Sequence, residues 1–175
     1  ASCVREPFRP NVVWIESTTI RSDGRRGMCT LIAIHRGVPG RPLVVAANRD
    51  EYLDRPAEGL AVRETRVGRV MAPLDVRAGG TWLGLNEHGV FAALTNLRTD
   101  SPDPSRRSRG EIVLDALAAG SAGGAVDLLL AQLGQGNARE TAPESGVAER
   151  IGGDSARYNP FNLFVADEAA AWVVV

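Results

Sequence analysis

The feature that most constrains the fold is a strand–turn–strand pattern that occurs twice. The first copy joins the apolar runs Cys29–His35 and Leu43–Ala47 through a loop that contains two Gly and two Pro residues. The second joins Gly79–Leu85 to Val90–Asn96 through a short turn that ends in Gly89. Short apolar runs separated by turn residues predict β-hairpins, and Gly supplies the positive φ that a tight loop requires. The chain is therefore expected to build antiparallel sheet.

Helical patterns follow the second hairpin and decide the fold class. Ser108 and Glu111 have the spacing of a capping box, which predicts a helix over Ile112–Ala119. A second helix is expected over Ala122–Leu133. Further strands are expected at Val70–Ala72, Asn162–Ala166 and Ala171–Val175. Strands, then two helices, then strands again predict an α+β protein with antiparallel sheet rather than a βαβ fold.

Three segments lie outside this regular pattern. Residues 1–27 carry Pro, Gly and charged residues that interrupt any period, so we expect a leader that is not part of the fold, with at most a short strand at Val12–Ile15. Residues 52–69 are polar and predict irregular structure. Residues 135–157 contain few apolar side chains and predict a long flexible insert within a domain that spans 28–175.

Composition narrows the classes of function. A chain of 175 residues with 44% hydrophobic and 23% charged residues can bury the core of a single globular domain. Its formal net charge of −1 argues against a nucleic-acid partner or an anionic-membrane surface, because either would require a basic excess. All 20 basic residues are Arg, so neither a Schiff-base lysine nor a P-loop lysine is available. Because no apolar run reaches about 18 residues, no membrane span is expected.

The register of the first hairpin places a thiol beside a polar cluster. If His35 pairs with Leu43, Cys29 lies opposite Arg49, next to the cluster Asn48–Glu51. A cation near a thiol lowers its pKa and favours the nucleophilic thiolate. The alternative is that Cys29 is a small core residue and that Asn48–Glu51 is a solvated turn. With two cysteines and no metal-ligand pattern, we expect a reduced, cytoplasmic protein without a metal site.

The second hairpin has a similar layout. Pairing of Leu85 with Val90 would bring Gly79 opposite Asn96 at the open end of the hairpin. Glycines allow close approach of a ligand to the backbone, and an Asn amide can donate a hydrogen bond to a developing oxyanion. The alternative is a twisted hairpin whose glycines serve only its geometry and whose Trp82 belongs to the core.

Other polar residues give weaker indications. Arg106, Arg107 and Arg109 cluster before the first helix, where they would bind a carboxylate or phosphate of a ligand, or form a solvated loop. His35 and His88 have no partner pattern and are expected at the surface.

Six ordered motifs resemble those of a known family. They are Met28–Thr30, Ala46–Glu51, Gly79–Gly84, Ala93–Asn96, Arg107–Glu111 and Tyr158–Leu163. In this order they resemble the NRDE family, also called the transport and Golgi organisation 2 family. The resemblance implies an N-terminal nucleophile hydrolase-like αββα sandwich, distantly similar to the choloylglycine hydrolases, whose C-terminal part we expect to be missing from this chain. We also expect a bacterial source. The resemblance also implies a link to haem handling.

The resemblance implies a set of site residues. In the related hydrolases an N-terminal Cys is the nucleophile and its own α-amine is the base. The corresponding catalytic candidates here are Cys29, Arg49, Asp50 and Asn96. Substrate-binding candidates are Asn48, Glu51, Gly80, Thr81, Trp82 and Arg109. The resemblance implies no cofactor for catalysis, whereas haem would be a ligand.

Two departures from the hydrolase pattern concern the same site. Cys29 follows 28 residues, so its amine is not free in this chain. Either the start is assigned too early, as Arg25–Gly27 before Met28 resemble a translated ribosome-binding site, or a propeptide is removed, or the chain is inactive. In addition, the choloylglycine hydrolases carry Arg three residues before the Asp, where this chain has Ala47.

Two functions therefore remain open from the sequence. The first is a cysteine N-terminal nucleophile hydrolase that acts on an amide or a related acyl C–N bond of a small molecule. The second is a non-catalytic carrier or chaperone of a hydrophobic cofactor such as haem, which would use the same cleft.

Overall fold

The structure is a computed structural model that describes residues 12–20, 26–51, 53–97, 99, 102–133, 140–141, 147–150 and 157–175. Its elements are β1 (Val12–Ile20), β2 (Arg26–Val38), β3 (Arg41–Asn48), β4 (Ala57–Thr65), β5 (Gly68–Asp75), β6 (Leu83–Asn86), β7 (Phe91–Asn96), α1 (Gly110–Ala116), α2 (Ala122–Leu133), β8 (Glu140–Thr141), β9 (Val147–Arg150), β10 (Phe161–Ala166) and β11 (Ala171–Val174). Neighbouring strands are antiparallel except β9 and β11. The fold is α+β, as predicted.

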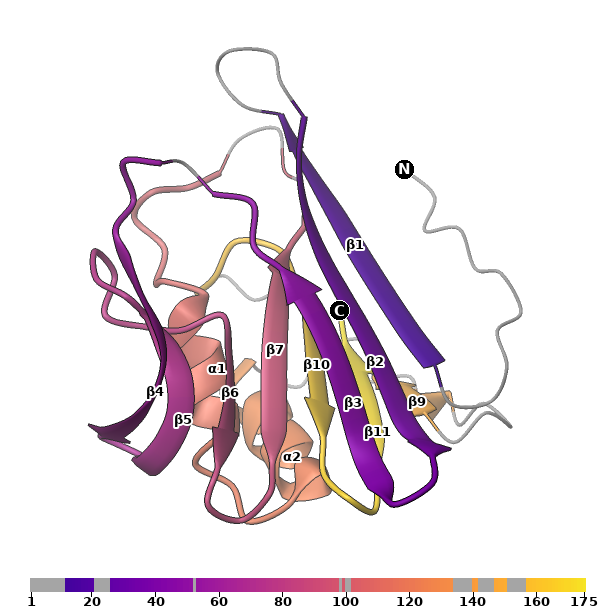
Figure 1. The fold of residues 1–175 in the computed structure, drawn as a ribbon. Helices are drawn as coiled ribbons and strands as arrows, with labels where there is room; N and C mark the ends of the chain where they lie inside the picture. The colour runs from indigo at the N-terminus through magenta and orange to yellow at the C-terminus, as the bar shows by residue number, and fades with distance from the viewer. Residues whose placement is uncertain are drawn as a thin grey trace.

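The described strands form two sheets. The smaller has the order β1-β2-β3, and the larger has the order β4-β5-β6-β7-β10-β11-β9-β8. Figure 1 shows α1 and α2 together on one face of the larger sheet, with the smaller sheet in front of the other face. This arrangement gives three layers in the described part of the chain. The four-layer αββα sandwich implied by the family resemblance stays a prediction.

The central strand β10 shows how the layers are held together. All of its residues are buried, and they alternate between two hydrophobic clusters. Leu163 and Val165 face the helices, whereas Phe164 and Ala166 face the smaller sheet. A strand covered on both faces is apolar at most positions, because successive side chains point to opposite sides. The exception in β10 is the buried Asn162, whose amide donates to the Thr95 hydroxyl at 3.2 Å. The predicted strands at 162–166 and 171–175 are confirmed to within one residue.

Strand β1 differs from the leader that the sequence predicted. It pairs with β2 along all of Val12–Ile20, well beyond the short strand expected at 12–15. Ile15 is only 8% exposed between the two sheets, whereas Trp14 is 54% exposed. This alternation has the period of a half-buried strand, which the Pro and Gly residues around it obscured. Residues 1–11 and 21–25 lie outside the described part, and a domain that begins at residue 28 stays a prediction.

The prediction of irregular structure over 52–69 was wrong for most of that segment. Strands β4 and β5 form a hairpin whose turn ends in Gly68 with a φ of 100°. The short strand predicted at Val70–Ala72 is the middle of β5. Strand β4 is an edge strand with mostly exposed residues, so its sequence lacks the apolar alternation by which strands are recognised.

The second predicted hairpin is present, but its register differs by one residue. Leu85 pairs with Phe91 rather than with Val90. The backbone N–H of Asn86 donates to the carbonyl of Val90 at 3.0 Å, so the loop has three residues and ends in Gly89 with a φ of 81°. A three-residue loop whose last residue is left-handed is a common hairpin geometry. The first hairpin has the predicted register, with His35 opposite Leu43.

The two predicted helices are both present, and α2 has the predicted bounds. Helix α1 begins at Gly110 rather than at Ile112 and ends at Ala116 rather than at Ala119, and the residue before it, Arg109, makes no side-chain capping hydrogen bond. The predicted capping box is therefore wrong, and Ser108 instead accepts from the N–H of Glu111 through its main-chain carbonyl. Strands β8 and β9 lie within the predicted insert, and the rest of 134–156 lies outside the described residues.

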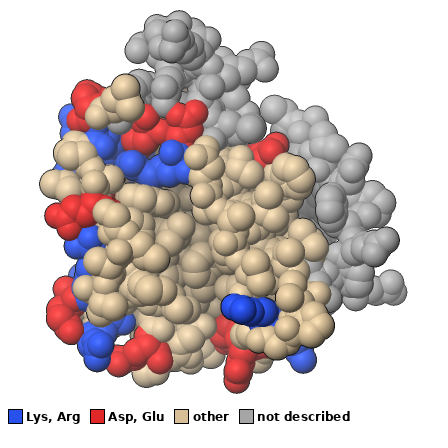
Figure 2. Space-filling model, in the orientation of Figure 1, with Lys and Arg blue, Asp and Glu red and all other residues tan. Residues whose placement is uncertain are grey.

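The surface on the side shown in Figure 1 mixes both signs of charge. Figure 2 shows Arg side chains next to Asp and Glu side chains around the edge of this face, with uncharged residues between them. None of the helices that the structure describes has the length and apolar character needed to cross a membrane.

Candidate functional site

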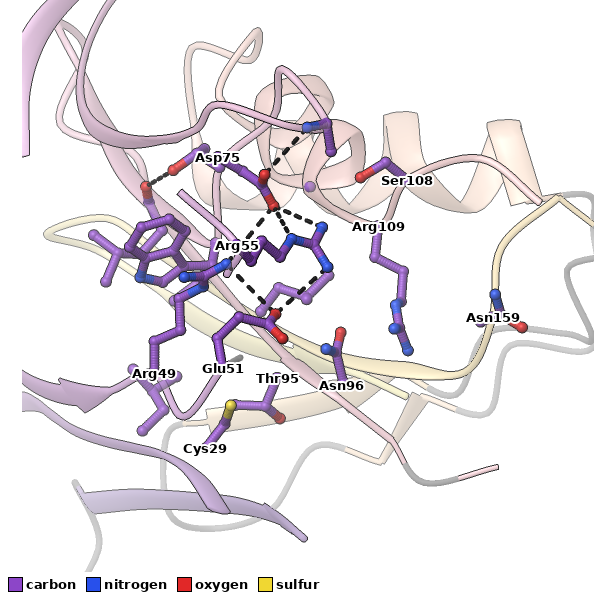
Figure 3. A pocket seen from close by; sticks show the side chains of 18 of the residues that line it. Cys29, Arg49, Glu51, Arg55, Asp75, Thr95, Asn96, Ser108, Arg109 and Asn159 are labelled. Carbon is purple, nitrogen blue, oxygen red and sulfur yellow. Dashed lines mark hydrogen bonds and ion pairs between the residues drawn. The ribbon is translucent and has the colours of Figure 1, made fainter. Parts of the chain in front are cut away.

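A cavity of about 280 Å³ lies where Cys29–Leu31 of β2 and the ends of β3 and β7 meet the loop before α1. Eight of the ten predicted site residues line it: Cys29, Asn48, Arg49, Glu51, Thr81, Trp82, Asn96 and Arg109. Figure 3 shows several of these side chains converging from separate segments of the chain. Asp50 and Gly80 do not line the cavity. The chemical roles assigned to all ten residues stay predictions.

Cys29 lies at the edge of the cavity, one position beyond the pairing of Thr30 with Asn48. Its thiol donates to the main-chain carbonyl of Asp50, with 3.7 Å between sulfur and oxygen. Burial raises the pKa of the Cys29 thiol, and the carboxylates of Glu51 and Asp50 raise it further, against the opposing effects of that hydrogen bond and of Arg49. Arg49 does lower the pKa of Cys29, as expected, but the other effects outweigh it. The expectation of a Cys29 pKa below its ordinary value was therefore wrong. Cys29 is a thiol at neutral pH.

The main chain on both sides of Cys29 belongs to one continuous strand. Strand β2 runs from Arg26 through Cys29, and β1 places Ser17 opposite Cys29 and Thr18 opposite Met28. In this chain the nitrogen of Cys29 is an amide, and an amide nitrogen is not a base. An α-amine at Cys29 requires that the bond to Met28 be absent.

Arg49 joins the two predicted hairpins at the cavity. Its guanidinium lies over the Trp82 ring, 4.3 Å from the ring centroid. The same group lies 3.4 Å from a carboxylate oxygen of Glu51 and 3.7 Å from one of Asp75. A planar guanidinium can stack on an aromatic ring while its edge binds carboxylates. These three contacts hold the Arg49 side chain in place in the wall of the cavity.

The sequence analysis missed Asp75 and Arg55, which form the centre of this network. Arg55 binds one carboxylate oxygen of Asp75 through two nitrogens, at 2.9 and 2.7 Å. The other oxygen accepts from the N–H groups of Arg77 and Ala78, both at 3.1 Å. Burial alone would raise the pKa of Asp75, but these hydrogen bonds and the Arg55 charge lower it overall. An Asp shortly before two glycines is a turn signal that would have drawn attention to this position.

Gly80 does not line the cavity but allows the second hairpin to pack closely against the start of α1. A Cβ at this residue would lie 2.8 Å from the carbonyl carbon of Gly110 at the start of α1. Only two residues without side chains can bring these backbones so close. The close approach lets Thr81 donate its N–H to the carbonyl of Gly110 at 3.4 Å, which holds the second hairpin against α1.

Asn96 and Arg109 lie at opposite ends of the segment that joins β7 to α1, and both line the cavity. Asn96 ends β7 and pairs with Phe161 of β10, not with Gly79 as the sequence predicted. Arg109 donates to the carbonyl of Pro160 at 3.0 Å. Burial, with a smaller contribution from the nearby Arg55, lowers the pKa of Arg109. In Figure 3 the guanidinium of Arg109 extends towards the amide of Asn96.

Comparison with known proteins places these motifs in a family. Residues 28–174 match the sequence model of the family described as Transport and Golgi organisation 2. The chain belongs to this family. It is 33% identical over 132 residues to the human Transport and Golgi organization protein 2 homolog, which covers 74% of this chain and 40% of that protein.

A second relative of the family is more similar over a shorter stretch. The mouse Transport and Golgi organization 2 homolog is 42% identical over 74 residues, or 41% of this chain and 26% of that protein. The chain therefore spans less than half the length of these members of the Transport and Golgi organisation 2 family.

Other polar residues of the two hairpins lie outside the cavity. The Asn86 amide donates to the carbonyls of Leu117 and Ala119 at 2.9 and 2.8 Å, which ties the second hairpin to the end of α1. His35, expected at the surface, is buried, and its Nε2 lies 2.9 Å from the carbonyl oxygen of Asp167. His88 is exposed, as predicted.

Proposed function

We propose that this chain is a cysteine nucleophile hydrolase that cleaves an amide or a related acyl C–N bond, with Cys29 as the nucleophile. The observation that supports the proposal is that the Cys29 thiol shares one cavity with the Asn96 amide and the Arg109 guanidinium. A nucleophile beside hydrogen-bond donors is the arrangement that acyl transfer requires. Membership of the Transport and Golgi organisation 2 family is compatible with this chemistry and does not specify it.

The reaction would proceed through a thioester. The Cys29 sulfur attacks the acyl carbon while its proton passes to a base, and the carbonyl oxygen becomes an oxyanion. The Asn96 amide donates a hydrogen bond to that oxyanion. The C–N bond then breaks, the leaving nitrogen takes the proton, and water hydrolyses the thioester to release the acid and regenerate the thiol.

The raised pKa of Cys29 makes the base essential, because little thiolate forms at neutral pH without one. The α-amine of Cys29 would serve, since an α-amine titrates near about pH 8 and lies on the same residue as the thiol. The proposal therefore requires a mature chain that begins at Cys29. Intact-mass measurement of the protein expressed from its own gene tests this requirement directly.

Acylation by p-nitrophenyl acetate tests the nucleophile. The mature protein should gain one acetyl group at Cys29 with a burst of p-nitrophenol, and Cys29→Ala should gain none. Arg69→Gln is the matched control, because this exposed arginine lies outside the cavity and its variant should be acetylated at Cys29 like the wild type. An acetyl group that appears equally on Cys29→Ala would remove the hydrolase proposal.

The alternative proposal is a carrier of a hydrophobic cofactor such as haem. Haem iron takes His, Cys, Met or Tyr as its axial ligand, and of these types the described lining residues include Cys29 alone. The same lining contains eight Arg, Asp and Glu residues, which suits a polar ligand better than a hydrophobic one. The residues therefore fit haem poorly. Saturable haem binding that is unchanged in Cys29→Ala, without acylation of Cys29, would favour the carrier.

A further inference from the structure

We propose that the cavity contains an anion subsite at Arg109, which binds a carboxylate of the ligand. The proposal rests on the proposed function in one respect, that the reacting end of the ligand meets Cys29. The subsite itself is argued from the charges that line the cavity and does not depend on turnover.

The lining carries more positive than negative charge. Five arginines and three acidic residues contribute to it: Arg49, Arg55, Arg106, Arg107, Arg109, Glu51, Asp75 and Asp103. Four of these arginines form ion pairs with carboxylates, in the pairs Arg49–Glu51, Arg55–Asp75, Arg106–Asp103 and Arg107–Glu111. Arg109 makes no ion pair with any carboxylate in the described part of the chain. The charge of Glu51 favours the Arg109 cation, but Glu51 forms ion pairs with Arg49 and Arg55 and not with Arg109.

Arg109 is held in place for such a role. Its Nη1 donates to the carbonyl of Pro160 at 3.0 Å, which fixes the side chain and leaves its other N–H groups for a ligand. The guanidinium is half-buried and lies near the positive charge of Arg55, and both conditions disfavour a cation. Because Arg stays protonated in proteins, the unfavourable charge is best relieved by an anion that enters the cavity.

The shape and charge of the Arg109 guanidinium favour a carboxylate over a phosphate. In Figure 3 the Ser108 hydroxyl lies away from the Arg109 guanidinium, so the subsite is assigned to Arg109 itself. A guanidinium fork matches the two oxygens of a carboxylate. A phosphate carries about −1.5 to −2 charges at pH 7, more than one unpaired arginine neutralises. The ligand class is therefore a small monocarboxylate whose acyl group lies towards Cys29.

Alkylation of Cys29 by two reagents of similar size tests the subsite without requiring a substrate. Iodoacetate carries a carboxylate and iodoacetamide is neutral, so the ratio of their rates cancels the fraction of thiolate. We expect Arg109→Gln to lower the iodoacetate-to-iodoacetamide ratio at Cys29 by about tenfold, because the attraction at short range is lost. Arg109→Lys should restore part of the ratio, since it keeps the charge but loses the fork. Peptide mass spectrometry separates Cys29 from Cys3.

Arg69→Gln is the matched control, because Arg69 is an exposed arginine outside the cavity with a side chain 62% exposed. It should leave the ratio unchanged. If circular dichroism shows that wild type and Arg109→Gln are both folded, an equal alkylation ratio in the two proteins would overturn the subsite.

Protection experiments distinguish the anion. Butyrate should slow alkylation of Cys29 by iodoacetamide more than butyramide or inorganic phosphate does, and only when Arg109 is present. Stronger protection by phosphate would overturn the assignment to a carboxylate. If butyrate protects but p-nitrophenyl acetate fails to acylate Cys29, the subsite stands and the hydrolase proposal falls.

Discussion

Arg49 lies over Trp82 with its guanidinium carbon 4.3 Å from the ring centroid, although Arg49 follows β3 of the smaller sheet and Trp82 precedes β6 of the larger sheet. This contact brings the Asn48–Glu51 cluster of the first hairpin against the second hairpin. The contact lies in the wall of the cavity beside Cys29, next to Leu31 and Ala93 of the apolar cluster between the two sheets.

Opposite charges beside Cys29 should shift its titration in opposite directions. Arg49 lowers the pKa of the Cys29 thiol and Glu51 raises it. We therefore expect Arg49→Gln to move the pH midpoint of iodoacetamide alkylation upwards and Glu51→Gln to move it downwards. Arg69→Gln, outside the cavity, should leave the midpoint unchanged. Movement in the same direction in both cavity variants would contradict the charge arrangement.

Asp75→Asn should destabilise the protein by about 2 kcal/mol at neutral pH, because it removes charged hydrogen bonds from a residue only 8% exposed. The pKa of Asp75 is lower in the folded protein than its ordinary value, so its contribution is complete above about pH 4 and is lost as the pH falls through the folded pKa. Urea unfolding from pH 3 to 7 measures this.

The control for Asp75 is Glu64→Gln, since Glu64 pairs with Arg69 at the exposed surface. It should change stability little at any pH. If the difference between wild type and Asp75→Asn grew on acidification, the ion pair would not be its source.

Gly80→Ala should cost about 2 kcal/mol, because the new Cβ would lie 2.8 Å from the backbone of Gly110. Gly123→Ala is the matched control in α2, where a Cβ would meet nothing within 4 Å. It should stabilise the protein by about 0.5–1 kcal/mol, since Ala restricts the unfolded chain and favours helix. Thermal unfolding of both variants checks the prediction, and equal effects would exclude the close approach.

Ile15→Ala tests whether β1 belongs to the native fold. Ile15 is 8% exposed between the sheets, so truncation should cost about 3 kcal/mol. The neighbouring Trp14 is 54% exposed, and Trp14→Ala should have a much smaller effect. Chemical denaturation measures both. A protein unaffected by either substitution would show that β1 does not contribute to its stability.

The sequence predicted the elements that carry strong local patterns. The first hairpin and α2 were predictable because turn residues and apolar periodicity agree there. Strand β4 was not, because an edge strand with exposed residues has no apolar face. The register of the second hairpin was missed because the sequence does not show that Asn86 pairs with Val90 around a three-residue loop.

The site was predictable where the motifs themselves line the cavity, as at Cys29, Arg49 and Trp82. Asp75 and Arg55 were missed because their importance comes from a salt bridge between residues 20 positions apart. The direction of the Cys29 pKa shift could not be predicted from the sequence either, because it depends on burial and on the position of Glu51 as well as on Arg49.

The continuity of β2 through Cys29 has a kinetic consequence for maturation. If the bond between Met28 and Cys29 were cut, residues Val12–Ser17 would still face Cys29–Ile34 across an intact ladder, with Ile15 in the core. The detached segment would then remain bound as a tight peptide ligand that keeps the new amine within the sheet. Under the proposed hydrolase function, activity would appear only after this peptide dissociates, which would be measured as a lag between cleavage and the first turnover.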